Sequence, residues 1–329
     1  MPTAINLTLL LLISLQIGEI WSVCNITALS SVDAITLNKD GKSEYHYGVN
    51  FNLMDGYRVI YVTKANVTEL CEGIVKFFGK LEELNLIDNN ISSVEKNAFQ
   101  HVPKLKKLSL AVNNLSVLKS GHVNMVKTLE VLYLTSNRLE IIDDDAFDDM
   151  INLKRIYLNR NKLKTISSSW FKNCSKLEVI DFTNNEITTI PPRAFTNLAP
   201  SFQDDFVQYK LSYNQITEIS PDVLDGNKEF LILRLDFNRL KELPVVVFKN
   251  LAQVNSLVLN SNQIACLDKE ILDYLKVHTI SFHLVNNPIE CACLDKFDNF
   301  VNDNAMQASF YYNTTFNCKL LKQMPVLIN

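Results

Sequence analysis

Glycine and proline are scarce in this 329-residue chain, which has eight and nine of them. Their scarcity excludes a collagen-like chain and one dominated by flexible linkers. Neither positive nor negative residues are in large excess, because the net charge is only -4. Such a chain has no basic field for a phosphate backbone, so we expect no nucleic-acid partner. Apolar residues make up 47% of the chain, which is enough to build a continuous core.

Motifs that carry catalytic or metal chemistry are also missing from the sequence. It contains no nucleophile elbow, no glycine-rich phosphate loop and no HExxH spacing, and its five histidines are dispersed. The densest acidic run, Asp143–Asp149, lacks the spacing of an EF-hand loop, and Phe147 within it belongs to a hydrophobic column described below. We therefore expect a protein that is not an enzyme and that needs no metal or cofactor.

Residues 1–22 resemble a secretory signal peptide. Leu7 to Ile17 form an eleven-residue apolar run that ends near the small residues Gly18 and Ser22. This run is too short to span a bilayer of about 30 Å, and no later segment reaches the length of a transmembrane helix. No lysine or arginine precedes the run, which departs from the usual signal-peptide pattern. We expect a secreted, extracellular protein.

One pattern of leucines and isoleucines before an asparagine recurs along most of the chain. Leu81, Leu84 and Leu86 precede the first of these asparagines at fixed spacing, and later repeats keep the same frame. The steps between asparagines are 24 residues, apart from one of 29 and a last one of 25. These ladder asparagines are Asn89, Asn113, Asn137, Asn161, Asn185, Asn214, Asn238, Asn262 and Asn287.

This pattern resembles the leucine-rich repeat family, whose consensus it matches over about two thirds of the chain. The resemblance implies an α/β solenoid, a right-handed horseshoe with short parallel strands on its concave face and a cap at each end. Residues such as Leu84 and Leu86 point inward on each strand, so neighbouring repeats must stack to bury them. The side-chain amide of each ladder asparagine would satisfy backbone groups in the turn after the strand.

Two hydrophobic columns follow the ladder asparagines. The first lies ten residues after each asparagine and runs from Phe99 to Leu272, and the second lies three residues further on. Cys174 falls in the second column, which predicts a buried free thiol rather than a catalytic one. The expected organisation is a signal peptide at 1–22, an N-terminal cap with degenerate repeats at 23–80, the array at 81–286 and a C-terminal cap at 287–329.

Degenerate repeats are expected within the N-terminal cap. Ile60, Val62 and Val67 fit the repeat frame, with Ala65 in the asparagine position. A weaker match upstream predicts one more unit, formed by Val32, Ile35, Leu37 and Asp40. Cys24 and Cys71 flank this region, and we predict that they form a disulfide that seals the first core layer.

The segment from Asn287 to Leu294 resembles the cysteine-containing C-terminal cap of extracellular leucine-rich repeat proteins, although the usual fourth cysteine is missing. Cys266 and Cys291 each lie four residues after a ladder asparagine, and such positions are about 5 Å apart in adjacent repeats. This spacing predicts the disulfides Cys266–Cys291 and Cys293–Cys318. The usage of the family instead implies Cys291–Cys318 and leaves Cys266 for Cys293.

Secretion gives meaning to six N-glycosylation sequons. Three of their asparagines fall in one column, directly after the ladder position of successive repeats, so glycans there would shield one edge of the N-terminal third. A protein ligand would then favour another surface. The predicted glycosylation sites are Asn25, Asn66, Asn90, Asn114, Asn173 and Asn313.

The expected ligand surface is the concave strand face. The residues between the two inward positions of each strand are Asn85, Ser109, Tyr133, Tyr157, Asp181, Lys210, Arg234, Val258 and Ser281. Aromatic residues and arginine are enriched at protein interfaces, although exposed strand tyrosines also arise from β-propensity alone. With flanking columns added, we predict a ligand site formed by Tyr133, Arg155, Tyr157, Arg160, Asp181, Lys210, Tyr213, Arg234 and Phe237.

Two segments ahead of the regular array, Asp33–Leu37 and Val59–Thr63, resemble insect extracellular leucine-rich repeat proteins, as does the phenylalanine column. Leucine-rich immune proteins of mosquitoes are similar in layout. Members of that family act in innate immunity by binding extracellular immune factors or pathogen-associated targets, often in assemblies built by a C-terminal coiled coil. This chain has no heptad segment, so the resemblance is to a short or coil-less type.

The resemblance thus implies noncovalent recognition of an extracellular protein or glycoconjugate. A matrix or cell-adhesion component, a soluble receptor-like protein and a secreted inhibitor would use the same face. Immune recognition predicts binding to microbial or immune proteins, and adhesion predicts retention at tissue surfaces. An inhibitor predicts loss of a partner's enzymatic activity. The sequence leaves the choice among these roles open.

Overall fold

The computed structural model describes residues 32–37, 42–49, 56–75, 78–196, 198, 207–225, 230–248, 253–290, 292–293 and 307–309. The signal peptide predicted at 1–22 lies outside the described residues. So do two of the sequon asparagines, Asn25 and Asn313, and three of the cysteines, Cys24, Cys291 and Cys318. The predictions made for them stay predictions.

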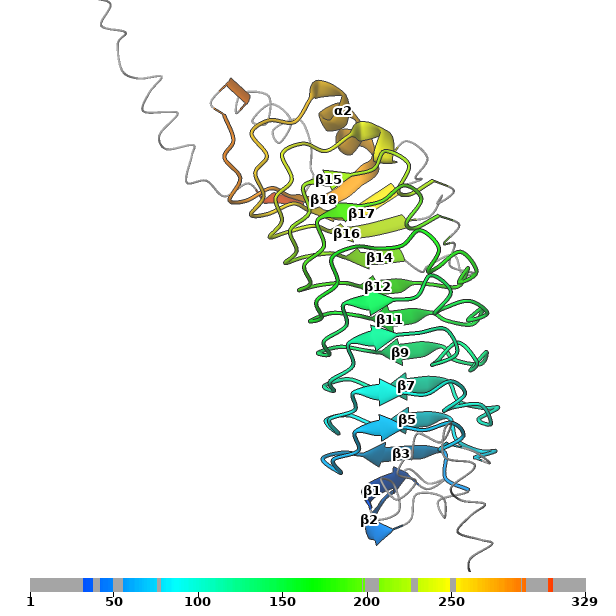
Figure 1. The fold of residues 1–329 in the computed structure, drawn as a ribbon. Coiled ribbons are helices and arrows are strands. Elements are labelled where there is room, and N and C mark those ends of the chain that lie inside the picture. Colours follow the sequence, from blue (N-terminus) through cyan, green and yellow to red (C-terminus); the bar gives the residue numbers. More distant parts are fainter. Residues whose placement is uncertain are drawn as a thin grey trace, which may run out of the picture.

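One sheet of thirteen strands runs along the described molecule (Figure 1). Its order is β19-β18-β17-β16-β14-β12-β11-β9-β7-β5-β3-β1-β2, so each new repeat adds a strand beside the previous one. From β3 to β19 every neighbouring pair is parallel. A stack of parallel strands from successive repeats is the architecture of a solenoid, and it confirms the fold that the repeats predict.

The strands of the main sheet are β1 (Val32–Leu37), β2 (Ser43–Val49), β3 (Val59–Val62), β5 (Glu83–Asn85), β7 (Lys107–Ser109), β9 (Val131–Tyr133), β11 (Arg155–Tyr157), β12 (Val179–Asp181), β14 (Val207–Lys210), β16 (Phe230–Arg234), β17 (Gln253–Val258), β18 (Thr279–His283) and β19 (Gln307–Ser309). Short strands on the other side of the coil form three parallel pairs. These are β4 (Glu69–Leu70) with β6 (Ser93–Val94), β8 (Val117–Leu118) with β10 (Ile141–Ile142), and β13 (Thr189–Ile190) with β15 (Glu218–Ile219). Near the C-terminal end lie the 3-10 turn η3 (Val245–Phe248) and the helix α2 (Lys269–His278).

The N-terminal end of the sheet differs from the prediction. Strand β1 pairs antiparallel with both β2 and β3, so the repeat unit predicted at Val32–Asp40 is wrong. Its alternating residues suit a strand of either direction, because the side-chain period is two in both. Thr36 lies beside the buried Ile60, is itself 0% exposed, and its hydroxyl contacts His46 Nε2 at 2.8 Å. A polar hairpin therefore ends the apolar stack.

The next predicted unit is confirmed as a repeat. Strand β3 pairs parallel with β5, and its inward residues Ile60 and Val62 are fully buried. Ala65 occupies the asparagine position, and its N–H donates to Oδ1 of Asn89 at 2.9 Å. The first ladder asparagine thereby holds this degenerate unit to the regular array.

Each ladder asparagine joins its own repeat to the preceding one. The Nδ2 of Asn137 donates to the carbonyl oxygens of Leu110 at 2.8 Å and Leu134 at 3.1 Å, and its Oδ1 accepts from the N–H of Leu115 at 3.0 Å. The other ladder asparagines make equivalent bonds, and none is more than 8% exposed. The predicted role of these amides in the turn backbone is confirmed.

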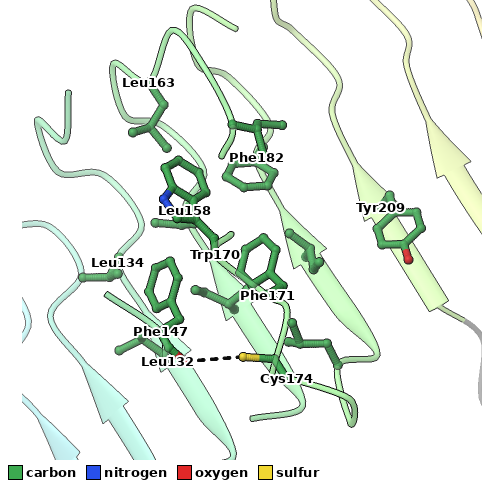
Figure 2. Close-up of a cluster of buried hydrophobic side chains, with 14 of the residues drawn as sticks. Leu132, Leu134, Phe147, Leu158, Leu163, Trp170, Phe171, Cys174, Phe182 and Tyr209 are labelled. Carbon is green, nitrogen blue, oxygen red and sulfur yellow. Dashed lines mark hydrogen bonds between the residues drawn. The ribbon is translucent and has the colours of Figure 1, made fainter. Parts of the chain in front are cut away.

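The interior of the coil holds the leucine columns and the phenylalanine column. Phe147 and Phe171 stack with ring centroids 5.6 Å apart, and Trp170 meets both rings edge-on at 6.3 Å (Figure 2). Cys174 is a buried free cysteine whose Sγ lies 3.6 Å from the Phe147 carbonyl oxygen. Burial and the nearby Asp148 raise the pKa of this thiol to about 12, so it stays protonated at neutral pH. The predicted buried free thiol is confirmed.

A disulfide joins Cys266 to Cys293, with their Cα atoms 5.7 Å apart. The pairing predicted from spacing, Cys266–Cys291 with Cys293–Cys318, is therefore wrong, and the partner of Cys266 is the one that family usage implies. Glu290 still follows the repeat, because its N–H donates to the Ala265 carbonyl oxygen at 2.8 Å. The N–H of Cys293 then donates to the Glu290 carbonyl oxygen at 2.9 Å, in a local turn that the repeat spacing does not contain.

Cys71, at the other end of the array, is also disulfide-bonded and is only 5% exposed. Its predicted partner, Cys24, lies outside the described residues, so their pairing stays a prediction. The predicted bond would tie the chain that precedes β1 to the first repeats.

Candidate functional site

The strand face of the middle repeats brings most of the predicted ligand residues together. The register places Tyr133 beside Tyr157, Tyr157 beside Asp181, and continues through Lys210 to Arg234. Each of these residues is the last of its strand and directly follows an inward, buried residue. Side chains alternate along a strand, so this row faces away from the core. We refer to it, together with Arg155 on β11, as the strand face.

Beyond Arg234 the same row continues to Val258 and then to His283. The sequence reading that put Ser281 in this row is wrong, because Ser281 pairs with Ser256 in the neighbouring row. The last asparagine step is one residue longer than usual, and counting back from Asn287 identifies His283. Ser281 and His283 are linked through a 2.7 Å contact between Oγ and Nε2.

Two tyrosines on the strand face form a stacked pair. The ring centroids of Tyr133 and Tyr157 are 4.8 Å apart, and the ring planes differ by 5°. Both side chains are half-buried. Burial, and then the neighbouring Tyr133, raise the pKa of Tyr157, so this hydroxyl is uncharged at neutral pH and can donate a hydrogen bond. The pair offers flat apolar surface with polar hydroxyl groups.

Arg160, Tyr213 and Phe237 lie elsewhere, in the column just before the ladder asparagines. Each has a φ of 57°, in the left-handed region. We refer to this column as the turn rim, and its other members with positive φ are Asp88, Val112, Ser136, Asn184, Ser261 and Asn286. A left-handed backbone costs a non-glycine residue about 1 kcal/mol. The repeat imposes this geometry at every step. Sequence reasoning placed these three residues beside the strands but did not predict their left-handed conformation.

The aromatic residues of the turn rim also stack. The rings of Tyr213 and Phe237 are 4.2 Å apart between centroids and differ by 9° in plane. Tyr213 is 51% exposed and Phe237 is 43% exposed, although large aromatic side chains are mostly buried in folded proteins. Sequence reasoning found both residues but did not predict their contact. An exposed, stacked pair is a ready apolar contact for another molecule.

Charges along the first repeats are paired with one another. Arg58 donates to both carboxylate oxygens of Glu82 at 3.0 and 2.7 Å, and Glu130 lies between Lys106 at 3.6 Å and Lys154 at 3.1 Å. These pairs are solvent-accessible, so each contributes at most about 1 kcal/mol. Their main effect is to neutralise the flank of the sheet.

The cations of the later repeats are different. Arg155 on the strand face is paired with Glu178 at 3.3 Å. Within the described ranges, no ion pair engages Arg160, Lys210 or Arg234. The four cations among the nine predicted ligand residues therefore divide into one that is paired and three that are not. Two of the unpaired cations, Lys210 and Arg234, each lie three residues before an exposed aromatic residue of the turn rim.

The sequon asparagines form a row of their own on the flank beyond the turn rim. Nδ2 of Asn90 donates to Oδ1 of Asn66 at 3.0 Å, and Nδ2 of Asn114 reaches Oδ1 of Asn90 at 3.5 Å. Asn66 and Asn90 are exposed, and Asn114 is half-buried. In the repeats that carry Tyr213 and Phe237, the equivalent positions are Gln215 and Arg239, which are not sequons. Asn173 is exposed on a different flank.

The acidic run at residues 143–149 is held by local partners. Lys172 pairs with Asp148 at 3.3 Å, Lys127 pairs with Asp149 at 3.4 Å, and the Ser167 hydroxyl contacts Asp144. Among the described residues there is no group of three His, Cys, Asp or Glu side chains placed to hold a metal ion. Nor does that part of the chain contain a helix long and apolar enough to cross a membrane.

Known proteins with similar sequences include leucine-rich repeat proteins. Residues 76–202 match the BspA type leucine rich repeat region in six copies. The human leucine-rich repeat and IQ domain-containing protein 4 is 41% identical over 80 residues, which is 24% of this chain and 14% of that protein. This chain is therefore similar to a small part of that human protein.

Two solved structures are also similar. A chain of the Drosophila Toll–Spatzle complex matches with a TM-score of 0.60 and 22% identity, over 68% of this chain and 29% of that chain. The complex of TLR13 with ssRNA13 matches with a TM-score of 0.43 and 22% identity, over 74% of this chain and 42% of that one. The Toll–Spatzle match shares the fold, so this chain has the leucine-rich repeat fold.

Proposed function

We propose that this protein binds another protein noncovalently through the strand face and the turn rim. We further propose that it is secreted and glycosylated, and that it acts as a recognition module of innate immunity. The observation that carries the proposal is the exposed stack of Tyr213 on Phe237 next to the unpaired cations Lys210 and Arg234. Aromatic and arginine side chains supply most binding energy at protein interfaces. The leucine-rich repeat fold supports binding rather than catalysis, because its strands present a broad continuous face.

The extracellular part of the proposal has separate support. Disulfides such as Cys266–Cys293 persist in oxidising compartments, and the apolar run in residues 1–22 resembles a signal peptide. The exposed sequons Asn66 and Asn90 occupy a flank of the first repeats, whereas the middle repeats carry none on that flank. Glycans would then leave the strand face and the rim aromatics open to a partner.

The immune part of the proposal draws on two likenesses. The Toll–Spatzle complex is described as a hub of Drosophila development and innate immunity, and its fold resembles this one. The sequence layout resembles that of mosquito leucine-rich immune proteins. A matrix or adhesion component, a soluble receptor-like protein and an inhibitor would use the same surface, so the identity of the partner distinguishes these roles.

The test is affinity capture from the extracellular fluid of the source organism, with partners identified by mass spectrometry. We expect the variant with Tyr213→Ser and Phe237→Ser to bind its main partner about 100-fold more weakly than wild type, because two aromatic anchors are lost. The variant with Tyr133→Ser and Tyr157→Ser should weaken binding as well. The matched control is Val112→Ser. Val112 is a residue of the turn rim that is 47% exposed and lies in an earlier repeat than the predicted ligand residues.

Each variant must keep the circular dichroism spectrum and thermal midpoint of wild type. Undiminished capture by both double variants would assign recognition to another surface and overturn the proposal. A microbial or immune partner supports the immune role. A structural matrix protein, or an enzyme that this protein inactivates, would replace that role while leaving the binding surface in place.

A further inference from the structure

We infer that the partner presents an acidic segment with a neighbouring apolar side chain. This segment binds two consecutive repeats that each carry a cation and an aromatic residue at the same two positions. This inference rests on the proposed function and adds the chemistry of the partner. The repeats supply Lys210 with Tyr213, and Arg234 with Phe237. In each, the cation ends the strand and the aromatic lies three residues later on the turn rim.

The two repeats place their matching residues side by side. Lys210 and Arg234 are register partners on the parallel strands β14 and β16, which lie about 4.8 Å apart. Tyr213 and Phe237 stack at 4.2 Å. A row of two cations therefore runs next to a row of two aromatic rings. A segment crossing these strands can reach both rows at once.

Neither cation forms an ion pair with an acidic side chain of the described residues, and like charges opposite each other on neighbouring strands destabilise a sheet. Asp181 is the register neighbour of Lys210, but its Oδ1 accepts from the Thr183 N–H at 2.9 Å, and Oδ1 of Asp236 accepts from a serine hydroxyl at 2.6 Å. A carboxylate from a partner would relieve the repulsion between Lys210 and Arg234.

The charge of Arg234 also acts on a histidine in the same row of the sheet. His283 lies two strands beyond Arg234 in the same row. Its pKa is lowered, first by burial and then by the charge of Arg234. The positive charge of Arg234 thus acts on an imidazole two strands away.

The neighbourhood favours a protein segment over a polyanion. Asp181 adjoins Lys210 in the register and Asp236 directly precedes Phe237, so the basic area is short and bounded by acids. A long sulphated or phosphorylated polymer would extend over these acids, whereas a short acidic segment would not. The exposed rings also favour an apolar side chain as their contact. One or two carboxylates beside a leucine, tyrosine or phenylalanine meet both requirements.

The test is selection from a phage-displayed library of random short peptides on three forms of the protein. These are wild type, the charge-reversed Lys210→Glu/Arg234→Glu variant, and the aromatic-deleted Tyr213→Ser/Phe237→Ser variant. We expect peptides selected on wild type to be enriched in Asp or Glu beside Leu, Tyr or Phe. Charge reversal should enrich Lys and Arg instead, and should weaken a selected acidic peptide by about tenfold or more.

A matched control keeps the total charge change the same. Lys119→Glu/Lys164→Glu alters two exposed lysines away from the strand face, and it should leave the selected peptides unchanged. Selected peptides could instead be neutral or basic, and bind the charge-reversed variant but not the aromatic-deleted one. That result would overturn the inference of an acidic segment and leave recognition through the turn rim in place. Peptides indifferent to both variants would overturn the inference of an acidic partner segment, whereas the proposed function is decided by the capture experiment. Heparin binding at physiological salt that charge reversal abolishes would assign the cations to a sulphated glycan instead.

Discussion

Replacing Asn161 with leucine is expected to lower the free energy of unfolding by about 4 kcal/mol. Its Nδ2 donates to the carbonyl oxygens of Leu134 at 3.0 Å and Leu158 at 2.9 Å, and its Oδ1 accepts from the N–H of Leu139 at 3.0 Å. Leucine is of similar size but leaves the buried Leu139 N–H unpaired, which costs about 1 to 3 kcal/mol. It also removes one of two hydrogen bonds at each carbonyl, about 1 kcal/mol each, because Leu134 keeps its bond from Asn137 and Leu158 keeps its bond from Asn185. Urea unfolding followed by circular dichroism measures the difference.

The matched control for this prediction is Asn159→Leu. Asn159 is half-buried, and its Oδ1 accepts one hydrogen bond, from the Thr135 hydroxyl at 2.7 Å. We expect this control to cost less than about 1 kcal/mol, because water can replace the lost bond. Equal effects of the two substitutions would show that the ladder bonds do not hold the repeats together.

Trp170→Ala is the second substitution with a large expected effect, a loss of about 4 kcal/mol. Trp170 is 3% exposed and packs against Phe147, Phe171 and Phe182, the last at 6.1 Å between ring centroids (Figure 2). Alanine would leave a cavity where the indole fills the interior, and the fixed spacing of the stacked strands limits its collapse.

Trp170→Phe separates packing from hydrogen bonding at the same site. Among the described residues Nε1 of Trp170 has no hydrogen-bond partner, so phenylalanine removes an unsatisfied donor while keeping an aromatic ring. We expect it to change the free energy of unfolding by about 1 kcal/mol or less. The preceding and following repeats have Ala146 and Ala194 at this position. If Trp170→Ala unfolds at the same urea concentration as wild type, this repeat can relax to the alanine geometry and the packing account is wrong.

The outer side of the coil marks a limit of sequence reasoning. A short strand begins there four residues after Asn137 and after Asn185, at β10 and β13. In the described structure no strand forms at the equivalent positions after Asn161, Asn238 or Asn262. The repeat pattern predicts the same local structure in every unit, whereas the outer strand forms in some units and not in others.

The buried columns were predictable because burial alone sets their period. A ladder asparagine every 24 residues, with leucines at fixed offsets, requires the same inward positions in each repeat, and Leu84, Leu108 and Leu132 are all fully buried. Strand direction was not predictable at the N-terminal end, since β1 and β3 share the same alternation. The partner of Cys266 was not predictable from spacing, because the local turn closed by the Cys293 N–H and the Glu290 carbonyl is not part of the repeat.

The candidate site was predictable as a set of residues but not as an arrangement. Column arithmetic brought Tyr133 and Tyr157 to adjacent strands, and their stacking follows from that register. It could not separate the strand face from the turn rim, because left-handed geometry at Tyr213 and Phe237 is a property of backbone hydrogen bonding between repeats. It also could not show which cations lack partners, which depends on long side chains meeting across strands.

The most direct test of recognition at the rim is a glycan placed beside it. Gln215→Asn creates the sequon Asn-Ile-Thr two residues after Tyr213, on the flank where the native sequons lie in earlier repeats. Thr165→Asn creates Asn-Ile-Ser at an exposed position on the other side of the coil and is the control. Both proteins are produced in secretory eukaryotic cells, and mass spectrometry confirms the added glycan.

The measurement is capture of the partner that binds wild type, with each variant folded as judged by circular dichroism. A glycan on the Gln215→Asn variant should abolish capture, because it covers the rim aromatics without changing them, and the Thr165→Asn control should capture the partner as wild type does. Full capture by the glycosylated Gln215→Asn variant would contradict the account and move recognition away from Tyr213 and Phe237.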